Sequence, residues 1–248
     1  MEPPDRSPAL VDGFVDFEFH PFFNLRTGQF LVPFGLEGPE PIFLNPSIER
    51  SVPSRRLNTY RMFRDVGINI YGRYSIVDYS LSVLNGNGAN IPESIDPKDV
   101  LLRLNFKLTE NFMTGISGQA GRYEAGSLGI FSRQRAGAHF ELNDVNSKNR
   151  FRGEFIYMDK QVETNVNEIS MGGYLLYGYE FSEKLESIYR LEYYRPHNHD
   201  NTYYGLTLGG NYFLADKTRL SLNCIGYTET GDLNNIQFLL NIQMQYVL

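Results

Sequence analysis

Five arginines gather in one short stretch of this 248-residue chain. Segment 50–64 has no Asp or Glu, and its basic residues are Arg50, Arg55, Arg56, Arg61 and Arg64. A guanidinium group is planar and permanently charged, and it can hold a phosphate or carboxylate through two parallel hydrogen bonds. The stretch could therefore bind anions. Alternatively, these arginines could pair with Glu49, Asp65 and other nearby acidic groups, or with lipid phosphates.

A second basic set comes from residue parity. Seven residues fall on the polar side of alternating segments: Arg103, Lys107, Arg133, Arg135, Arg150, Arg152 and Arg190. A charge that faces lipid at mid-membrane costs roughly 2–4 kcal/mol, so these groups are expected to face a water-filled lumen, where rings of Arg and Lys select for anions. Five acidic residues share those faces and could pair with them across strands, which would leave only modest selectivity: Glu141, Glu154, Glu180, Glu186 and Glu192.

The segments that position these side chains alternate with a period of two, which is typical of β-strands and not of helices. About thirteen such segments occur, near 10–19, 24–34, 64–75, 77–85, 102–108, 112–121, 132–142, 149–159, 169–181, 184–195, 203–213, 217–227 and 236–248. We find no convincing helix. No run approaches the roughly 20 apolar residues that a membrane-spanning helix requires.

The last segment has the clearest pattern. One face carries Ile236, Phe238, Leu240, Ile242, Met244, Tyr246 and Leu248, and uncharged polar residues dominate the other. A strand of this kind suits a barrel wall with lipid on one side and water on the other.

The connectors alternate in length. Short turns at 20–24, 109–111, 182–184 and 214–217 are interleaved with longer polar links at 35–63, 86–98, 122–131, 160–168, 196–202 and 228–233. Outer-membrane barrels have short turns on the periplasmic rim and long loops on the other. The sequence therefore predicts an all-β protein, a transmembrane antiparallel β-barrel that forms a single domain over 1–248. Link 35–63 is the candidate to fold into the lumen and narrow it.

Aromatic residues cluster at the ends of the expected strands. They are Phe17, Phe19, Tyr74, Phe106, Phe112, Tyr177, Tyr179, Phe181, Tyr212 and Tyr246. Amphipathic rings suit headgroup depth, so we expect these residues to form the two aromatic girdles of a barrel.

Several pieces resemble a known family in order and spacing. Segment 28–37 (GQFLVPFGLE), then Glu49-Arg50, then 64–67 (RDVG), then 83–88 (VLNGNG), is similar to the phosphate-selective porin O and P family. The resemblance implies a sixteen-stranded, trimeric outer-membrane porin of a Gram-negative-type cell, of which this chain represents about thirteen strands. It also implies passive diffusion of small polar or anionic solutes, contact with outer-membrane lipid and lipopolysaccharide, and no cofactor. The chain departs from the family by lacking the opening strands and by ending in Leu248, where Phe is commoner.

The odd strand number and the absence of a signal peptide suggest that N-terminal strands are missing and that 1–9 is disordered or truncated. Unpaired backbone groups in hydrocarbon cost several kcal/mol each. We therefore expect the chain alone to aggregate, to swap strands, or to close with strained pairing between 10–19 and 236–248. Sharp single-channel steps from this chain alone would contradict that expectation.

Other functions have weaker support. The net charge of −6 argues against nucleic acid, and the single cysteine, Cys224, excludes an internal disulfide framework. Segment 197–200 (HNHD) lacks a third well-placed metal ligand, so we interpret it as a solvated turn. We expect no catalytic residues. A barrel lipid hydrolase stays open as an alternative that loss of activity in His139→Ala would support, and a soluble apolar-ligand barrel is a further alternative that solubility without detergent would support.

Overall fold

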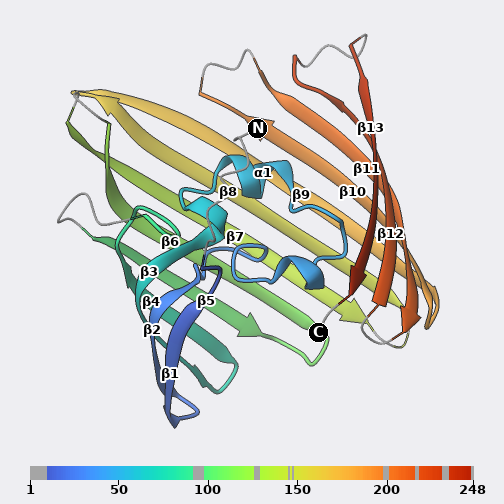
Figure 1. Cartoon of the computed structure of the whole chain (residues 1–248), viewed down its shortest axis with the longest axis horizontal. Helices are drawn as coiled ribbons and strands as arrows, with labels where there is room; N and C mark the ends of the chain where they lie inside the picture. Colours follow the sequence, from blue (N-terminus) through green and yellow to red (C-terminus); the bar gives the residue numbers. More distant parts are fainter. Residues whose placement is uncertain are drawn as a thin grey trace.

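The computed structural model describes residues 10–91, 98–125, 129–144, 146, 148–197, 201–215, 218–230 and 235–246. In these residues, thirteen strands form one antiparallel sheet in chain order (Figure 1). The strands are β1 (Gly13–His20), β2 (Phe23–Leu31), β3 (Arg64–Tyr74), β4 (Val77–Leu84), β5 (Asp99–Lys107), β6 (Phe112–Glu124), β7 (Ile130–Asp144), β8 (Asn149–Glu163), β9 (Val166–Ser182), β10 (Leu185–Arg195), β11 (Tyr203–Ala215), β12 (Thr218–Thr228) and β13 (Gln237–Tyr246). The predicted all-β architecture is confirmed. None of the helices in the described part is long and apolar enough to cross a membrane.

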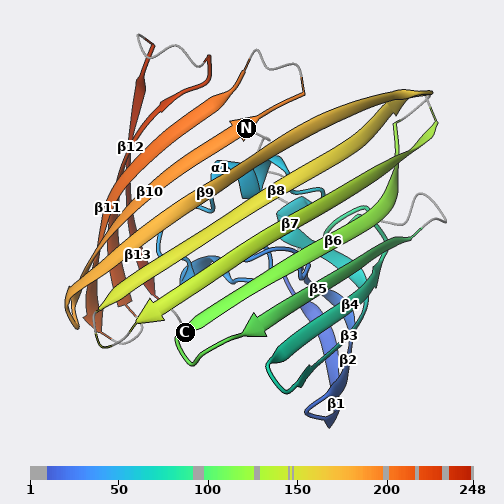
Figure 2. The same ribbon diagram turned by 180° about the vertical axis from the view of Figure 1, so that it is seen from behind.

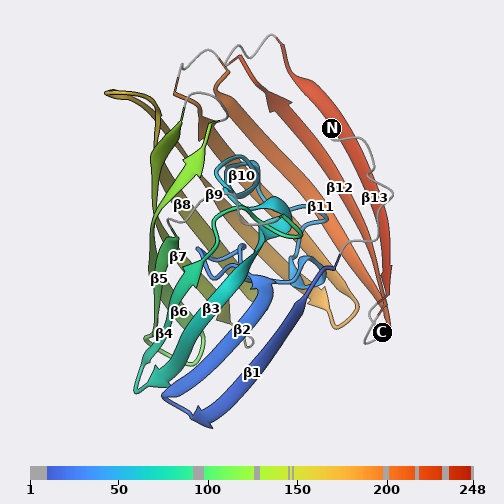
Figure 3. The ribbon, with the colours of Figure 1, turned by 60° about the vertical axis from the view of Figure 1, so that its left-hand side comes forward.

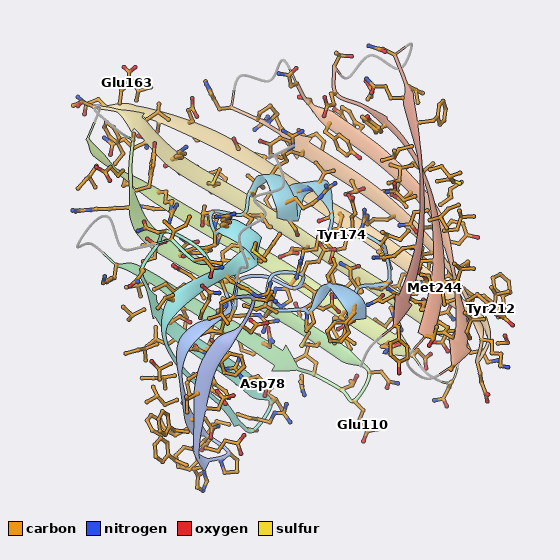
Figure 4. The ribbon with its side chains drawn as sticks, viewed as in Figure 1. Asp78, Glu110, Glu163, Tyr174, Tyr212 and Met244 are labelled. Carbon is orange, nitrogen blue, oxygen red and sulfur yellow. The ribbon has the colours of Figure 1, made fainter. Side chains whose placement is uncertain are left out.

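The sheet has the polarity of a barrel wall, with polar groups inside and apolar groups outside. On β10, Arg190 is 1% exposed on the concave face, whereas its neighbour Leu191 is 59% exposed on the outer face. Tyr174 lies on the concave side, beneath the link between β2 and β3, while Tyr212 and Met244 project from the outer face (Figure 4). In water such an outer surface would oppose folding, so the strands are built to meet lipid.

The sheet curves strongly but does not close. The convex back runs continuously through the middle strands (Figure 2), and a side view shows β1 and β13 at the two edges (Figure 3). Among the described residues, β1 pairs only with β2 and β13 only with β12. The strained pairing between 10–19 and 236–248 that the sequence left open therefore does not occur here.

The link between β2 and β3 lies inside the curve of the sheet (Figures 1 and 3). It contains two 3₁₀ turns, Ile42–Leu44 and Arg61–Phe63, and one short helix, α1 (Val52–Arg56). The Ser51 side chain accepts a hydrogen bond from Ser54 N at 3.2 Å and so caps α1. Helix α1 was not expected from the sequence, because five residues are too few to show a helical period.

Two of the predicted long links are wrong. β6 continues to Glu124 and β7 begins at Ile130, so the link between them is shorter than predicted. β8 and β9 meet in a tight hairpin. The pairing extends through Lys160 opposite Glu168, and Asn165 adopts a positive φ of 66° in the turn. Segments 122–131 and 160–168 read as loops because they are polar, yet strands that continue past the bilayer are polar on both faces.

The predicted aromatic girdles are in fact one girdle. All ten side chains lie near the short-turn rim, where β1–β2, β3–β4 and each later odd–even pair are joined. Phe151, Tyr177 and Tyr189 form a continuous contact there, with ring centroids 4.9 and 6.1 Å apart. The outward aromatics of the opposite rim, such as Tyr193 and Tyr204 near the ends of β10 and β11, are not among these ten.

Candidate pore wall and inner segment

Residues 32–63, here called the inner segment, are bound to the concave wall through buried polar side chains. Glu154 on β8 accepts hydrogen bonds from Leu36 N at 3.0 Å and from Ser54 Oγ at 3.1 Å. On β6, Ser117 Oγ accepts from Gly35 N at 3.0 Å. Glu154 therefore attaches two parts of the inner segment, residues 35–37 and α1, to the same strand, β8.

A second anchor is Asp99 on β5, which is 0% exposed. Its Oδ2 accepts from Tyr60 Oη, Gln119 Nε2 and Arg133 Nη2, each at 2.8 Å. Three buried donors on one carboxylate oxygen make a fully enclosed charge pair, Asp99–Arg133. Tyr60 ties the return limb of the inner segment to that pair.

The far side of the wall holds the segment through its backbone. Arg190 Nη1 donates to Glu49 O at 2.8 Å, Asn211 Nδ2 to Pro46 O at 2.8 Å, and Arg219 Nη1 to Asn45 O at 3.0 Å. The inner segment thus contacts strands from β5 to β12. This arrangement removes much of the cross-section that the curved sheet would otherwise enclose.

An apolar cluster lies beneath part of the inner segment. It consists of Phe30, Val32, Phe34, Leu57, Tyr60, Leu84, Leu101 and Ile156. Burial of these side chains excludes water from that side of the lumen and holds the segment against the wall. The sequence analysis expected this link to fold into the lumen but did not name the cluster, although the apolar residues within a mostly polar link were a usable signal.

The arginines of segment 50–64 lie in different environments. Arg50 is buried: it donates to Glu37 O at 2.9 Å and stacks 4.2 Å from the Phe63 ring centroid. Burial lowers the pKa of Arg50 from its ordinary value, with Glu37 opposing the shift. Its role is structural, because its guanidinium holds the backbone of the inner segment.

Arg55 and Arg56 end α1 with their side chains 46% and 61% exposed. Arg55 Nη1 lies 2.9 Å from Glu49 Oε2, and Arg56 Nη2 lies 3.4 Å from Glu229 Oε1. Exposed pairs of this kind are weak, so both guanidinium groups can exchange partners with a passing anion.

Arg61 and Arg64 lie at the return of the inner segment to β3. Arg64 makes a two-pronged pair with Asp12, with both nitrogen–oxygen distances 2.9 Å. Arg61 is exposed and forms no ion pair within the described residues. The cluster seen in sequence is therefore spread over buried, paired and exposed positions.

The strand arginines face inward as expected from parity, and most are paired. Arg150 lies 3.0 Å from Glu186, and Arg190 lies 3.2 Å from Glu192. Arg152 contacts Glu40 of the inner segment at 2.8 Å and Glu141 at 3.3 Å. Arg135 donates to Leu57 O at 2.9 Å. The wall is mixed in sign, and its arginines chiefly hold the inner segment.

Glu40 is a partly buried acid of the inner segment, with its side chain 19% exposed. Desolvation raises the pKa of Glu40 above the ordinary value of 4.5, and Arg152 opposes this shift. Glu40 therefore takes up a proton at a higher pH than an ordinary glutamate does.

The short-turn end of the lumen contains a polar cavity of about 500 Å³. Arg103 lines it together with Arg26 and Arg73, which the sequence analysis did not single out. Arg26 pairs with Asp16 at 2.7 Å, and Lys107 approaches Asp78 at 3.5 Å. Arg26 and Arg73 could have been predicted from the sequence, because the alternation of β2 and β3 places both on the inward face.

The candidate catalytic histidine is placed inside the wall. His139 is 3% exposed, and its Nε2 lies 2.9 Å from Asn105 Oδ1. Ser132 hydrogen-bonds Gln161 at 3.3 Å and lies far along β7 from His139. In the described part of the chain no group of three or more His, Cys, Asp or Glu could hold a metal. Residues 198–200 of the HNHD turn, and the expected N-terminal segment 1–9, lie outside the described residues.

Comparison with known proteins supports this architecture. An anion-selective porin from Comamonas acidovorans matches with a TM-score of 0.67 and 13% identity over 91% of this chain and 74% of that chain. OmpT of Vibrio cholerae, an outer-membrane protein, matches with a TM-score of 0.70 and 11% identity over 94% and 79%. This chain has a porin-like fold. No family model matches, and no curated protein matches. The outer-membrane barrel expected from the sequence is thus confirmed at the level of fold.

Proposed function

We propose that the protein is a passive outer-membrane porin for small hydrophilic solutes, with a preference for anions. One observation carries the proposal: a 32-residue inner segment covers the concave wall and leaves two arginines exposed at the end of α1. A segment that only connected two strands would have no reason to lie within the lumen. Held there, it narrows the path and brings Arg55 and Arg56 toward passing solutes.

Removing these two charges should weaken anion preference. We expect Arg55→Ala with Arg56→Ala to lower the anion-to-cation permeability ratio about two- to fivefold, because each exposed guanidinium lies beside a carboxylate that partly cancels it. The measurement is the reversal potential under a salt gradient in a planar bilayer, made on a closed assembly of the protein, since the sheet of one chain stays open within the described residues. An unchanged ratio would contradict the role of α1 in selectivity.

Arg122 provides the matched control. It is exposed on the outer face of β6, so Arg122→Ala removes one positive charge, against two in the double variant, without changing the lumen. The control should leave the reversal potential unchanged. An equal fall in both variants would mean that overall charge, and not α1, sets the preference.

Selectivity should also depend on pH through Glu40. Its raised pKa means that it becomes neutral in mild acid before ordinary carboxylates do, which leaves Arg152 with more net positive charge. Anion preference should therefore rise as the pH falls through the raised pKa of Glu40, at a higher pH than an ordinary glutamate would give. Glu40→Gln should already have the higher preference at neutral pH and lose most of this dependence. A pH dependence that stays the same in Glu40→Gln would assign it to other groups.

Phosphate as the preferred anion, membership of the phosphate-selective porin O and P family and a trimeric state are part of this proposal. One solved structure with a similar fold, OmpT of Vibrio cholerae in trimer form, has a TM-score of 0.67 and 12% identity, so the trimer is a reasonable assembly to test by cross-linking. Competition by phosphate against chloride current tests the solute. We propose no catalytic activity, because within the described residues the ring of inward-facing His139 contacts Asn105 and forms no hydrogen bond with a serine.

A further inference from the structure

A groove of about 840 Å³ crosses the outer face of the sheet over β7 to β12. Its sides include Phe140, Phe155, Leu175, Leu191, Leu206 and Ile236. Its floor includes Gly153, over which the Phe140 ring lies, and Gly226. These strands lie on the convex back of the sheet (Figure 2). The groove belongs to the face that meets the membrane and is separate from the lumen.

The lining is almost entirely carbon, and the volume is in the range of pockets that hold small molecules. In a bilayer the available occupant is an acyl chain. A flexible chain can enter a groove that is open along its length, and it fills the depression above Gly226, where the nearest side-chain atom to an added Cβ would be at an ordinary 3.4 Å.

One end of the groove has the chemistry of a headgroup site. The Tyr193 and Tyr204 rings lie 5.4 Å apart and form part of its wall. Arg195 follows on the same face of β10, two residues beyond Tyr193. Its Nη2 contacts Met171 Sδ at 3.4 Å, and no carboxylate within the described residues pairs with it. Arg195 therefore offers a positive charge without an ion-pair partner among the described residues, at the depth where lipid phosphates lie.

The rim that carries Arg195 is the long-loop rim, since β10 and β11 are joined there by residues 196–202. In outer-membrane barrels that rim faces the outside, where the outer leaflet consists of lipopolysaccharide. We propose that the groove binds an acyl chain of lipid A, with a lipid A phosphate held by Arg195 and the two tyrosines flanking the sugar. This inference rests on the membrane placement in the proposed function but not on ion conduction.

The single cysteine allows a direct test. Cys224 is exposed on the outer face of β12, two residues from Gly226, so a bimane label there reports on the groove. The full chain, extracted from membranes in mild detergent, is titrated with hexa-acylated lipid A, with dephosphorylated lipid A and with phosphatidylglycerol. We expect a saturable change with lipid A, and a midpoint at least fivefold higher for the dephosphorylated form and for phosphatidylglycerol.

Two variants with matched controls locate the site. Gly226→Leu fills the floor, and its added Cβ would lie at an ordinary 3.4 Å from the Phe238 ring; Gly118→Leu adds the same side chain on β6, with open space around it and away from the groove. Arg195→Gln removes the headgroup charge, and Arg122→Gln removes a comparable outward charge elsewhere. The groove and Arg195 variants should weaken lipid A binding about fivefold, with rescue by Arg195→Lys, whereas both controls should bind normally.

Three results would overturn the proposal. Equal binding of phosphatidylglycerol would make the groove a general anionic-lipid site, and a signal that depends on protein concentration and not on lipid would make it a contact between copies. Equal midpoints for all variants would mean simple micelle partition. Single-channel recording of Arg195→Gln separates this test from the porin proposal: unaltered current with weakened lipid binding supports the site. Normal lipid binding without current would affect only the pore.

Discussion

Replacing Glu154 with alanine should release the inner segment, raise single-channel conductance and lower thermal stability. The carboxylate is buried and accepts from Leu36 N, Glu37 N and Ser54 Oγ, at 3.0, 3.5 and 3.1 Å. Each buried group left without a partner costs about 1–3 kcal/mol, so we expect a loss on the order of 3–5 kcal/mol. A freed segment no longer narrows the lumen, and conductance should rise at least twofold with more current noise.

Conductance in planar bilayers and the temperature of unfolding in detergent measure these two effects. Glu180→Ala is the matched control, because Glu180 is also inward and acidic but its side chain is 48% exposed, and its ion pair among the described residues is a long one, with Arg150 at 3.9 Å. The control should stay close to the unsubstituted protein in both measurements. Normal conductance in Glu154→Ala would mean that the segment is held by its other contacts, and the proposed role of Glu154 would be wrong.

Replacing Asp99 with alanine should destabilise the barrel by a similar amount. Asp99 is fully buried with Arg133, Tyr60 and Gln119, and removal of one partner of a buried ion pair costs about 3–5 kcal/mol because the other charge remains unpaired. The denaturant midpoint for unfolding measures the loss. Ion selectivity should change little, since Arg133 is covered by the inner segment.

A double substitution separates lost pairing from lost packing. Asp99→Ala with Arg133→Met removes both charges, so it should recover part of the stability that Asp99→Ala alone loses. For comparison, Asp78→Ala breaks a partly exposed pair with Arg73 and should cost no more than about 1 kcal/mol. A double variant less stable than Asp99→Ala would show that the buried charges are not coupled.

Strand identity and facing followed from local pattern alone. The alternation at 236–248 predicted the outward Phe238, Leu240 and Met244 of β13, and parity predicted that Arg190 and Arg152 point inward. Side chains of a strand point to opposite faces with a period of two, and a wall between lipid and water rewards that alternation at every position. All thirteen strands could therefore be predicted, although their ends could not.

The predicted strand ends are wrong where polar composition was taken to indicate a loop. Segment 160–168 is polar yet paired, because β8 and β9 continue beyond the apolar band with opposite charges facing each other. The ten aromatics singled out from the sequence all lie near the short-turn rim, whereas Tyr193 and Tyr204, at the long-loop rim, were not among them. Polar composition indicates contact with water, and water surrounds an extended hairpin as it does a loop, so composition alone does not distinguish the two.

The sequence by itself determined a sheet with an apolar outer face and an inner face that carries both basic and acidic residues. Only the tertiary structure decided which of those charges are buried and which are exposed. Arg133 and Arg152 are bound to Asp99 and Glu40, whereas Arg55 and Arg56 stay exposed, and no spacing in the chain distinguishes them. The distinction depends on contacts such as Glu154 with Leu36 and Glu192 with Val52, which join residues more than a hundred positions apart. Such pairing exists only after the sheet curves and brings its wall around the inner segment.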